Sequence, residues 1–129
     1  MLLAVETGKY IEDIPHRTEF ERWRSRLSEP DFQAICAALN KRADDAAAGS
    51  QVLTAGWIPG NDWAGTIYEP IYQTACDQNA DEAGLCFGLF VWVVLQQRTG
   101  DVWGFGRYEK DGVPIRSMTY FVVRNPPPR

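Results

Sequence analysis

The sequence predicts an α+β domain in which about four helices pack on a small antiparallel sheet. Three observations predict this class. Apolar residues recur at helical spacing in the first part of the chain, a long uncharged run lies in the middle, and residues after Gly100 alternate with period two around an Asp-Gly turn. We expect helices near 19–27, 29–48, 67–76 and 80–98, a C-terminal hairpin of strands 101–109 and 113–124, and a further strand at 51–58.

The first helix is predicted from a capping signal and an apolar face. Thr18 and Glu21 have the three-residue spacing of a capping box, so we expect Thr18 to begin the helix. Between Phe20 and Leu27 the apolar residues fall on one helical face. Three arginines in the same stretch lie mostly on the other side, which we interpret as a solvated face rather than as a basic patch.

The second helix also begins with a clear signal. Ser28 is a good N-cap, and Pro30 falls in the first turn, where proline is tolerated. Near the other end stand Asp44 and Asp45. Adjacent aspartates on a helix point in different directions, so we interpret them as a solvated helix end and not as metal ligands.

The uncharged run from Ala83 to Leu95 leaves two structures open. Its valines and aromatic residues suit a buried strand. Asn79, with Glu82 three residues later, is a capping signal that favours a helix over 80–98. In such a helix the small residues at 80, 84 and 88 share one side and would let another backbone approach closely.

The same run also bears on membrane association and on the oligomeric state of the protein. It spans ~13 residues, and a membrane helix needs ~20 residues, so we expect no membrane association. Covering so apolar a helix on every side is demanding for one small chain. We therefore expect a homo-oligomer, most simply a dimer.

Length and composition exclude several classes. The chain has 129 residues, which fits a single domain over 1–124, with 1–17 as a possible arm and 125–129 as a disordered tail. Thirteen basic and 17 acidic residues give a net charge of −4, which argues against nucleic-acid binding. The three cysteines lack CxxC spacing and there is one histidine, so we expect no metal, no cofactor and reduced thiols in a cytoplasmic protein.

The hairpin suggests a ligand site. Asp111-Gly112 between alternating runs is typical of a two-residue turn, and this register places Arg107 opposite Arg116 and Trp103 opposite Tyr120. Directly opposed arginines repel and favour an anion between them. We predict that Arg107 and Arg116 bind the anionic group of a small amphipathic ligand whose apolar part contacts Trp103 and Tyr120. The alternative is that both arginines pair with the protein's own carboxylates.

The opposite face of the hairpin carries Gly104 and Gly106. Glycines in a strand often mark a place where another part of the structure comes close, so we expect a groove in which a helix packs.

A second candidate site is the loop from Gly60 to Thr66, which joins a strand to the expected helix near 67–76. The loop lacks the lysine of a phosphate-binding P-loop, so an NTPase is not expected. Aromatic residues around it predict the wall of a binding pocket, and we name Trp63, Tyr68 and Tyr72 as its members.

Standard catalytic sets are missing from the sequence. A single histidine and the absence of a GxSxG motif leave acid–base chemistry to carboxylates, of which Asp62 and Glu69 are the candidates. We therefore favour a non-catalytic binding or interaction module, whose ligand is a small amphipathic anion or whose partner is a protein. The alternatives are a small enzyme that uses an Asp62/Glu69 acid–base pair and a purely structural subunit of a homo-oligomer.

Overall fold

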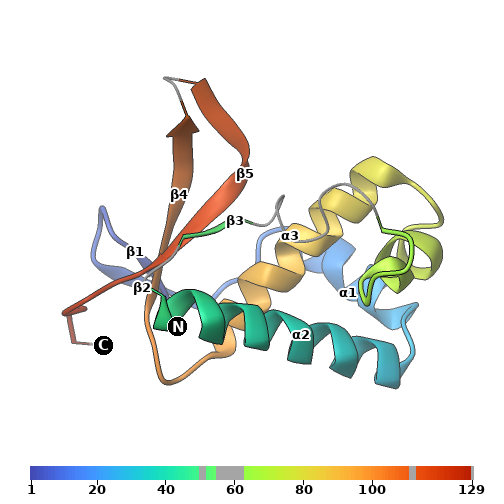
Figure 1. The fold of residues 1–129 in the computed structure, drawn as a ribbon, viewed down its shortest axis with the longest axis horizontal. Coiled ribbons are helices and arrows are strands. Elements are labelled where there is room, and N and C mark those ends of the chain that lie inside the picture. Colours follow the sequence, from blue (N-terminus) through green and yellow to red (C-terminus); the bar gives the residue numbers. More distant parts are fainter. Residues whose placement is uncertain (50–51, 55–62, 111–112, 129) are drawn as a thin grey trace.

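The computed structural model describes residues 1–49, 52–54, 63–110 and 113–128, with side chains described for all of these except 54, 107–110 and 113–117. The helices lie to one side of a mixed sheet (Figure 1), which confirms the α+β class. The helices are α1 (Arg17–Ser25), α2 (Glu29–Ala48), the π-helical turn η2 (Ile71–Ala75) and α3 (Ala80–Gln97). The strands are β1 (Leu2–Ala4), β2 (Lys9–Ile11), β3 (Leu53–Thr54), β4 (Trp103–Lys110) and β5 (Val113–Val122).

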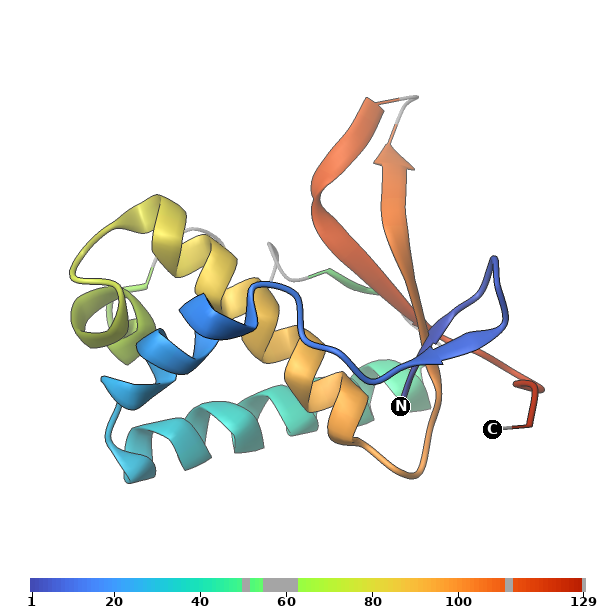
Figure 2. The same cartoon turned by 180° about the vertical axis from the view of Figure 1, so that it is seen from behind.

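The central uncharged run is a helix, α3, and not a strand. Its first turn is capped as predicted, because the Asn79 side chain accepts a hydrogen bond from the Glu82 backbone N–H at 3.1 Å. Every side chain from Leu89 to Leu95 is buried. α1, α2 and η2 all pack against α3, which lies at the centre of the core (Figure 2).

Aromatic rings join α3 to its neighbours on different sides. The ring of Phe20 in α1 lies 5.1 Å from that of Phe90, measured between centroids. On the sheet side, the rings of Trp92 and Phe105 lie 4.9 Å apart. From the sequence, a second copy of the chain was expected to help bury the apolar helix α3. In the structure, elements of the same chain pack around it. The oligomeric state itself stays a prediction.

The row of small residues on α3 does not carry a close backbone contact. No atom of the described residues lies within 4 Å of where a Cβ on Gly84 or Gly88 would stand, the helix's own backbone aside. The expectation that another backbone packs there is therefore wrong for the described part of the chain. Leu85, next to this row, is exposed.

The start of α2 was predicted correctly and the start of α1 was not. The Ser28 hydroxyl accepts from the Asp31 backbone N–H at 3.2 Å. α1 begins at Arg17, after a left-handed His16 with φ of 51° whose side chain makes no cap bond. The His16 carbonyl already accepts from the Phe20 N–H at 3.0 Å, so Thr18 lies inside the first turn instead of capping it.

The predicted helix near 67–76 is reduced to η2, a five-residue π-helical turn. Before it, hydrogen bonds from Glu69 N–H to Thr66 carbonyl and from Ile71 N–H to Tyr68 carbonyl close short turns instead of a regular helix. Proline at 70 has no N–H to offer a helical ladder. The chain therefore reaches α3 through turns rather than through a long helix.

The sheet has the strand order β2-β1-β4-β5-β3. β1 pairs with β4 in parallel and the other pairs are antiparallel, so the sheet is mixed and not purely antiparallel as expected. Leu2 and Leu3 of β1 are buried, although the sequence left residues 1–17 open as an arm. Of the predicted strand 51–58, the structure describes 52–54, and β3 lies within it. The Tyr10 hydroxyl donates to the Pro127 carbonyl at 2.6 Å, which ties the described part of the tail to β2.

The hairpin starts from the predicted pair of residues but does not keep the predicted register, and Asp111 and Gly112 themselves lie outside the described residues. Lys110 pairs with Val113 as expected. Between Arg107 and Glu109 the register shifts, so Arg107 stands opposite Met118, two residues beyond the predicted Arg116. The predicted opposition of the two arginines is therefore wrong, because an irregularity in one strand cannot be read from a turn signal.

The shift leaves the faces of the hairpin unchanged, since side chains alternate with period two. Trp103 pairs with Val122 and not with Tyr120, whose partner is Phe105. These four side chains share the face that packs on the helices.

The groove expected at Gly104 and Gly106 is filled at Gly104, but not by a helix, and at Gly106 no described atom lies within 4 Å of where a Cβ would stand. A Cβ on Gly104 would lie 2.5 Å from the ring of Phe121 and 2.9 Å from Cγ2 of Val5. The close approach is thus made by neighbours in the sheet and by the turn after β1, and not by a helix.

Candidate functional site

Three of the predicted binding residues come together against α3. The rings of Trp63 and Tyr72 stack with centroids 6.3 Å apart and planes inclined by 11°. Trp63 and Tyr68 each meet the ring of Phe87 edge-on, at 5.8 Å and 5.0 Å. Tyr68 is buried, whereas Trp63 and Tyr72 are half-buried. These contacts explain the three rings as part of the hydrophobic core. Because Trp63 and Tyr72 are only half-buried, some of their aromatic surface stays exposed.

The phenol of Tyr68 is held in its neutral form. Burial raises its pKa, and the charge and hydrogen bond of Arg42 offset this only in part. At neutral pH the group can donate or accept a hydrogen bond, but it does not act as a base.

The Glu69 side chain stabilises the loop that precedes it. One carboxylate oxygen accepts from the Gly65 N–H at 2.9 Å. Asp62, the other half of the predicted acid–base pair, lies outside the described residues. The pair therefore stays a prediction, and the described oxygen of Glu69 already has a structural partner.

Beside Glu69 a hollow of about 450 Å³ lies between α2 and residues 66–74. Its described lining contains two carboxylates and no basic side chain, so it does not suit an anion. It is lined by Asp31, Ala34, Thr66, Ile67, Glu69, Pro70, Gln73 and Thr74.

The residues of the predicted anion site are not presented together. Trp103 is 0% and Tyr120 1% exposed, and burial raises the pKa of the Tyr120 phenol. Neither ring offers a surface to a ligand in this structure. Arg107 and Arg116 lie in β4 and β5, and their side chains are outside the description. The geometry on which the site was predicted, two opposed arginines, is replaced by Arg107 opposite Met118.

The arginines of the first helix have contacts that the sequence did not reveal. The guanidinium carbon of Arg24 lies 4.0 Å from the centre of the Phe32 ring, a cation–π contact between α1 and α2. Arg26 donates to the Ala75 carbonyl at 2.8 Å. Around Arg24 is a hollow of about 290 Å³ lined by Glu21, Arg24, Ser25, Leu27, Glu29 and Phe32. Interpreting these arginines as merely solvated missed partners that come from other elements.

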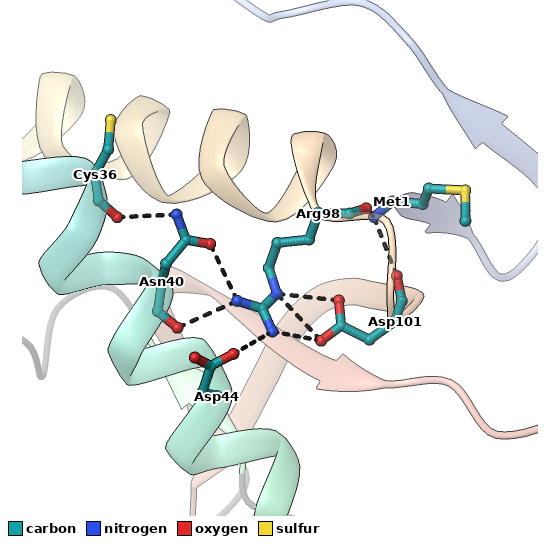
Figure 3. A network of polar contacts seen from close by, with 6 residues as sticks. All are labelled: Met1, Cys36, Asn40, Asp44, Arg98 and Asp101. Atoms are coloured by element: carbon teal, nitrogen blue, oxygen red, sulfur yellow. Dashed lines mark hydrogen bonds and ion pairs between the residues drawn. The ribbon is translucent and has the colours of Figure 1, made fainter. Parts of the chain in front are cut away.

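The densest polar cluster surrounds Arg98 at the end of α3 (Figure 3). Its guanidinium donates to both carboxylate oxygens of Asp101, at 2.8 to 3.1 Å. It also donates to Asp44 at 2.6 Å, and to the backbone carbonyl and the side-chain oxygen of Asn40 at 3.2 Å and 3.0 Å. Arg98 and Asp101 are 15% and 13% exposed at their side chains. Asp44, predicted to be solvated, is thus an ion-pair partner.

The Met1 ammonium group adjoins this cluster. It donates to the carbonyls of Leu95, Arg98 and Asp101. Burial alone would raise the pKa of Asp101, but the hydrogen bonds and charge of Arg98, with the charge of the ammonium group, hold this pKa below its usual value. Because all the guanidinium N–H groups have acceptors within the protein, Arg98 stabilises the fold and its guanidinium has no donor left for a ligand.

The hairpin reaches beyond the strands that flank it. Within the described residues, β1 pairs with β4 at Trp103 and Gly104, and β3 pairs with β5 at Thr119 and Tyr120. Among the described strands, nothing pairs with the outer edges of the hairpin beyond these residues. Figure 1 shows this part of β4 and β5 extending away from the helices.

Within the described residues, no group of three histidine, cysteine, aspartate or glutamate side chains is placed to hold a metal ion. In the same part of the chain, no helix combines the length and the apolar character needed to cross a membrane.

No protein-family model matches the chain, and comparisons with curated proteins and with solved structures gave no match. The functional argument therefore rests on the chain's own residues.

Proposed function

We propose that the chain is a non-catalytic interaction module that pairs with a second copy of itself through the outer edge of β4. One observation supports this proposal: the hairpin is two-stranded beyond the short pairings of β1 and β3, among the strands that are described. An unpaired strand edge is a template for another strand. A ribbon of two strands alone is only marginally stable in water, so a third strand would stabilise it.

The direction of the backbone supports β4 as the pairing edge. The Trp103 N–H points to the β1 side, where it donates to the Met1 carbonyl at 2.9 Å. In a strand, residues separated by an even number present their N–H groups to the same edge. The Arg107 N–H therefore points to that edge too, beyond the last residue that pairs with β1.

The opposite edge is less suited to strand addition. β5 contains Pro114, which has no N–H to donate, and the register shift of the hairpin lies close by. Proline and bulges are features that protect strand edges from pairing. β4 has no proline from end to end.

The sequence of β4 is complementary to itself. If two copies pair antiparallel about a two-fold axis at Tyr108, Arg107 of one copy stands opposite Glu109 of the other, twice. Opposite charges across a strand pair contribute roughly 0.2–1 kcal/mol each. In the same register, the side chains at positions 107 and 109 would repel each other if both carried the same charge.

The proposal is tested by native mass spectrometry of the full chain at two protein concentrations, with two variants at one position. Arg107→Pro removes the outward N–H and leaves the ladder to β5 intact, so it should abolish the dimer. Arg107→Ala keeps the N–H and removes the charge from both pairs, so it should weaken the dimer by only about two- to thirtyfold.

A wild-type chain that is monomeric at both concentrations would refute the proposal. So would an Arg107→Pro variant that dimerises as well as the wild type. If Arg107→Ala and Arg107→Pro abolish the dimer equally, the guanidinium and not the backbone edge is what the partner binds. Far-UV circular dichroism of both variants checks that the hairpin substitution has not unfolded the domain.

A further inference from the structure

The hollow where α1 turns into α2 carries side chains of both charges and is reached directly from solvent. Both helices contribute to its walls, because one ends and the other begins beside it (Figure 2). Ligand pockets usually have volumes of ~300–1,000 Å³, so a hollow of about 290 Å³ suits a small molecule. The described lining is Glu21, Arg24, Ser25, Leu27, Glu29 and Phe32.

The guanidinium of Arg24 is held in place but is not used by the protein. Its central carbon lies 4.0 Å from the centre of the Phe32 ring, a cation–π contact that restrains the side chain. Glu21, three residues earlier on α1, pairs with Arg17 at 3.9 Å instead. None of the ion pairs among the described residues includes Arg24. Such a guanidinium is suited to bind a carboxylate through two parallel hydrogen bonds.

Glu29 lines the same hollow from the first turn of α2. One of its carboxylate oxygens accepts from Nε2 of Gln33 at 2.8 Å, and this donor is neutral, so the negative charge of Glu29 is not compensated there. Within the described part of the chain, no cationic group pairs with Glu29. An ammonium group of a ligand would supply the missing opposite charge.

The lining also has an apolar part. Leu27 is buried at the turn between the two helices. Phe32 is half-buried and packs on Phe90 of α3, with ring centroids 5.7 Å apart, so its position is fixed by the core. An aliphatic group of a ligand that contacts Leu27 and Phe32 would remove apolar surface from water, which favours binding.

We propose that this hollow binds a small aliphatic α-amino acid. Arg24 binds its carboxylate, Glu29 binds its ammonium group, and the side chain of the ligand contacts Leu27 and Phe32. The site is independent of the pairing proposed for β4, which lies in the sheet and contributes no residue to the hollow.

The charges of the lining favour a zwitterion over a simple ion. A plain carboxylate would be attracted by Arg24 but repelled by Glu21 and Glu29. A plain amine would be attracted by the two glutamates and repelled by Arg24. An amino acid has both charges on neighbouring atoms, so it offers an opposite charge to Arg24 and to Glu29 at once.

The first test is an NMR titration of the isotope-labelled full chain with L-leucine. The backbone amide signals of Arg24, Glu29 and Phe32 should shift, with a Kd of about 1 mM, because each charge pair at a solvent-exposed site contributes little. Two half-ligands are the controls. Isocaproate has the carboxylate without the ammonium group, isoamylamine has the ammonium group without the carboxylate, and each should bind at least about tenfold more weakly.

Three outcomes of this titration would overturn the proposal. The first is that L-leucine shifts no signal at about 10 mM, well above the expected Kd. The second is that isocaproate or isoamylamine binds as tightly as L-leucine, because the zwitterion is then not what the site recognises. The third is that the shifts occur only away from the turn between α1 and α2.

Two matched pairs of variants test the residues. Arg24→Gln should weaken L-leucine binding at least about tenfold, whereas Arg22→Gln, at an exposed arginine of α1 outside the lining, should leave it unchanged. Glu29→Gln should weaken it similarly, whereas Glu6→Gln, at an exposed glutamate between β1 and β2, should not.

All four substituted side chains are exposed, so each variant should keep the fold, which far-UV circular dichroism checks. Equal losses of binding in Arg24→Gln and Arg22→Gln would show that the general charge of α1, and not the hollow, attracts the ligand. That result would refute the proposal, and so would an unchanged Kd in Arg24→Gln.

Discussion

Two glycines in β4 stand two residues apart on the same face, yet they have different reasons to be glycine. At Gly104 the ring of Phe121 and the side chain of Val5 occupy the space that a Cβ would need. At Gly106 no described atom lies within 4 Å of that position. The closeness of Phe121, and not the strand backbone, is what excludes a side chain at 104.

Gly104→Ala should therefore destabilise the fold by about 1 kcal/mol, because a Cβ at 2.5 Å from the Phe121 ring forces this exposed ring and the exposed Val5 side chain to move. Gly106→Ala is the matched control, and it should be neutral or slightly stabilising, since the space is open and alanine restricts the unfolded chain. Urea denaturation of both variants measures the difference. Equal stabilities would mean that Phe121 does not pack over Gly104.

Single residues of the candidate site show the limit of sequence reasoning. The alternation of the hairpin correctly placed Trp103 and Tyr120 on one face, but it could not show that this face is covered completely. Trp63 and Tyr72 were expected to form part of one aromatic pocket wall around the loop from Gly60 to Thr66, and their rings stack. The partners of Arg98 could not be predicted, because Asn40 and Asp44 come from a helix far away in the sequence.

The ends of the helices are where local sequence predicted structure best. Ser28 and Asn79 cap α2 and α3 as expected, because the bond joins a side chain to a backbone N–H three residues away. Thr18 carries the same signal and makes no such cap, because α1 starts earlier, after a left-handed His16. A capping motif therefore predicts a helix start only where the chain before it is free to enter the helix at that residue.

This difference predicts that removing the Ser28 hydroxyl and removing the Thr18 hydroxyl change the free energy of unfolding by different amounts. Ser28→Ala should lower the free energy of unfolding by about 1 kcal/mol, since the Asp31 N–H loses its acceptor. Thr18→Ala should cost nothing or stabilise α1 slightly, because alanine is the better helix former inside a turn. Thermal unfolding followed by circular dichroism compares the two. A similar loss for Thr18→Ala would show that Thr18 caps α1 after all.

Short strands were the hardest elements to predict. The described part of β3 lies within the predicted strand 51–58, but β1 and β2 are three residues each, so their alternation is too brief to be distinctive. The hairpin was clear because its strands are long and joined by a strong turn signal, and even there the register shift near Arg107 escaped prediction. The shift matters for function, because it removes the pair of opposed arginines.

At the scale of the whole molecule, the Arg98 cluster joins parts of the chain that no single helix or strand connects. It links the end of α3 to α2 through Asn40 and Asp44, and to the segment before β4 through Asp101. The α+β class was predictable from local patterns, since each pattern names an element. The meeting of these elements at one point was not predictable, because it depends on contacts between residues far apart in sequence.

Because of the Arg98 cluster, we expect the stability of the fold to decrease as the pH is lowered into the acid range. The pKa of Asp101 is lowered in the folded chain, so its contribution is present above the ordinary aspartate pKa of about 3.9 and is lost as pH falls through the lower folded value. Asp101→Asn should cost about 3 kcal/mol near neutral pH, because it leaves the largely buried Arg98 without its main partner. The gap between wild type and variant should shrink below about pH 4.

Urea unfolding at several pH values measures this gap. The control is Asp45→Asn, which removes the exposed partner of Lys41 and should change stability by at most about 0.5 kcal/mol at any pH. A gap for Asp101→Asn that stays constant from neutral to acid pH would show that the carboxylate charge is not what stabilises the cluster.

The parallel pairing of β1 with β4 has a consequence for the order in which the protein can form. Trp103, the β4 partner of Leu2, is added to the growing chain about 100 residues after it. At roughly 5–20 residues per second, β1 waits for about 5–20 seconds while the helices are made. Leu2 and Leu3 can pair with β2 as soon as that strand is made, but their pairing with β4 must wait through the interval, so this part of the sheet closes only after the helices have been made.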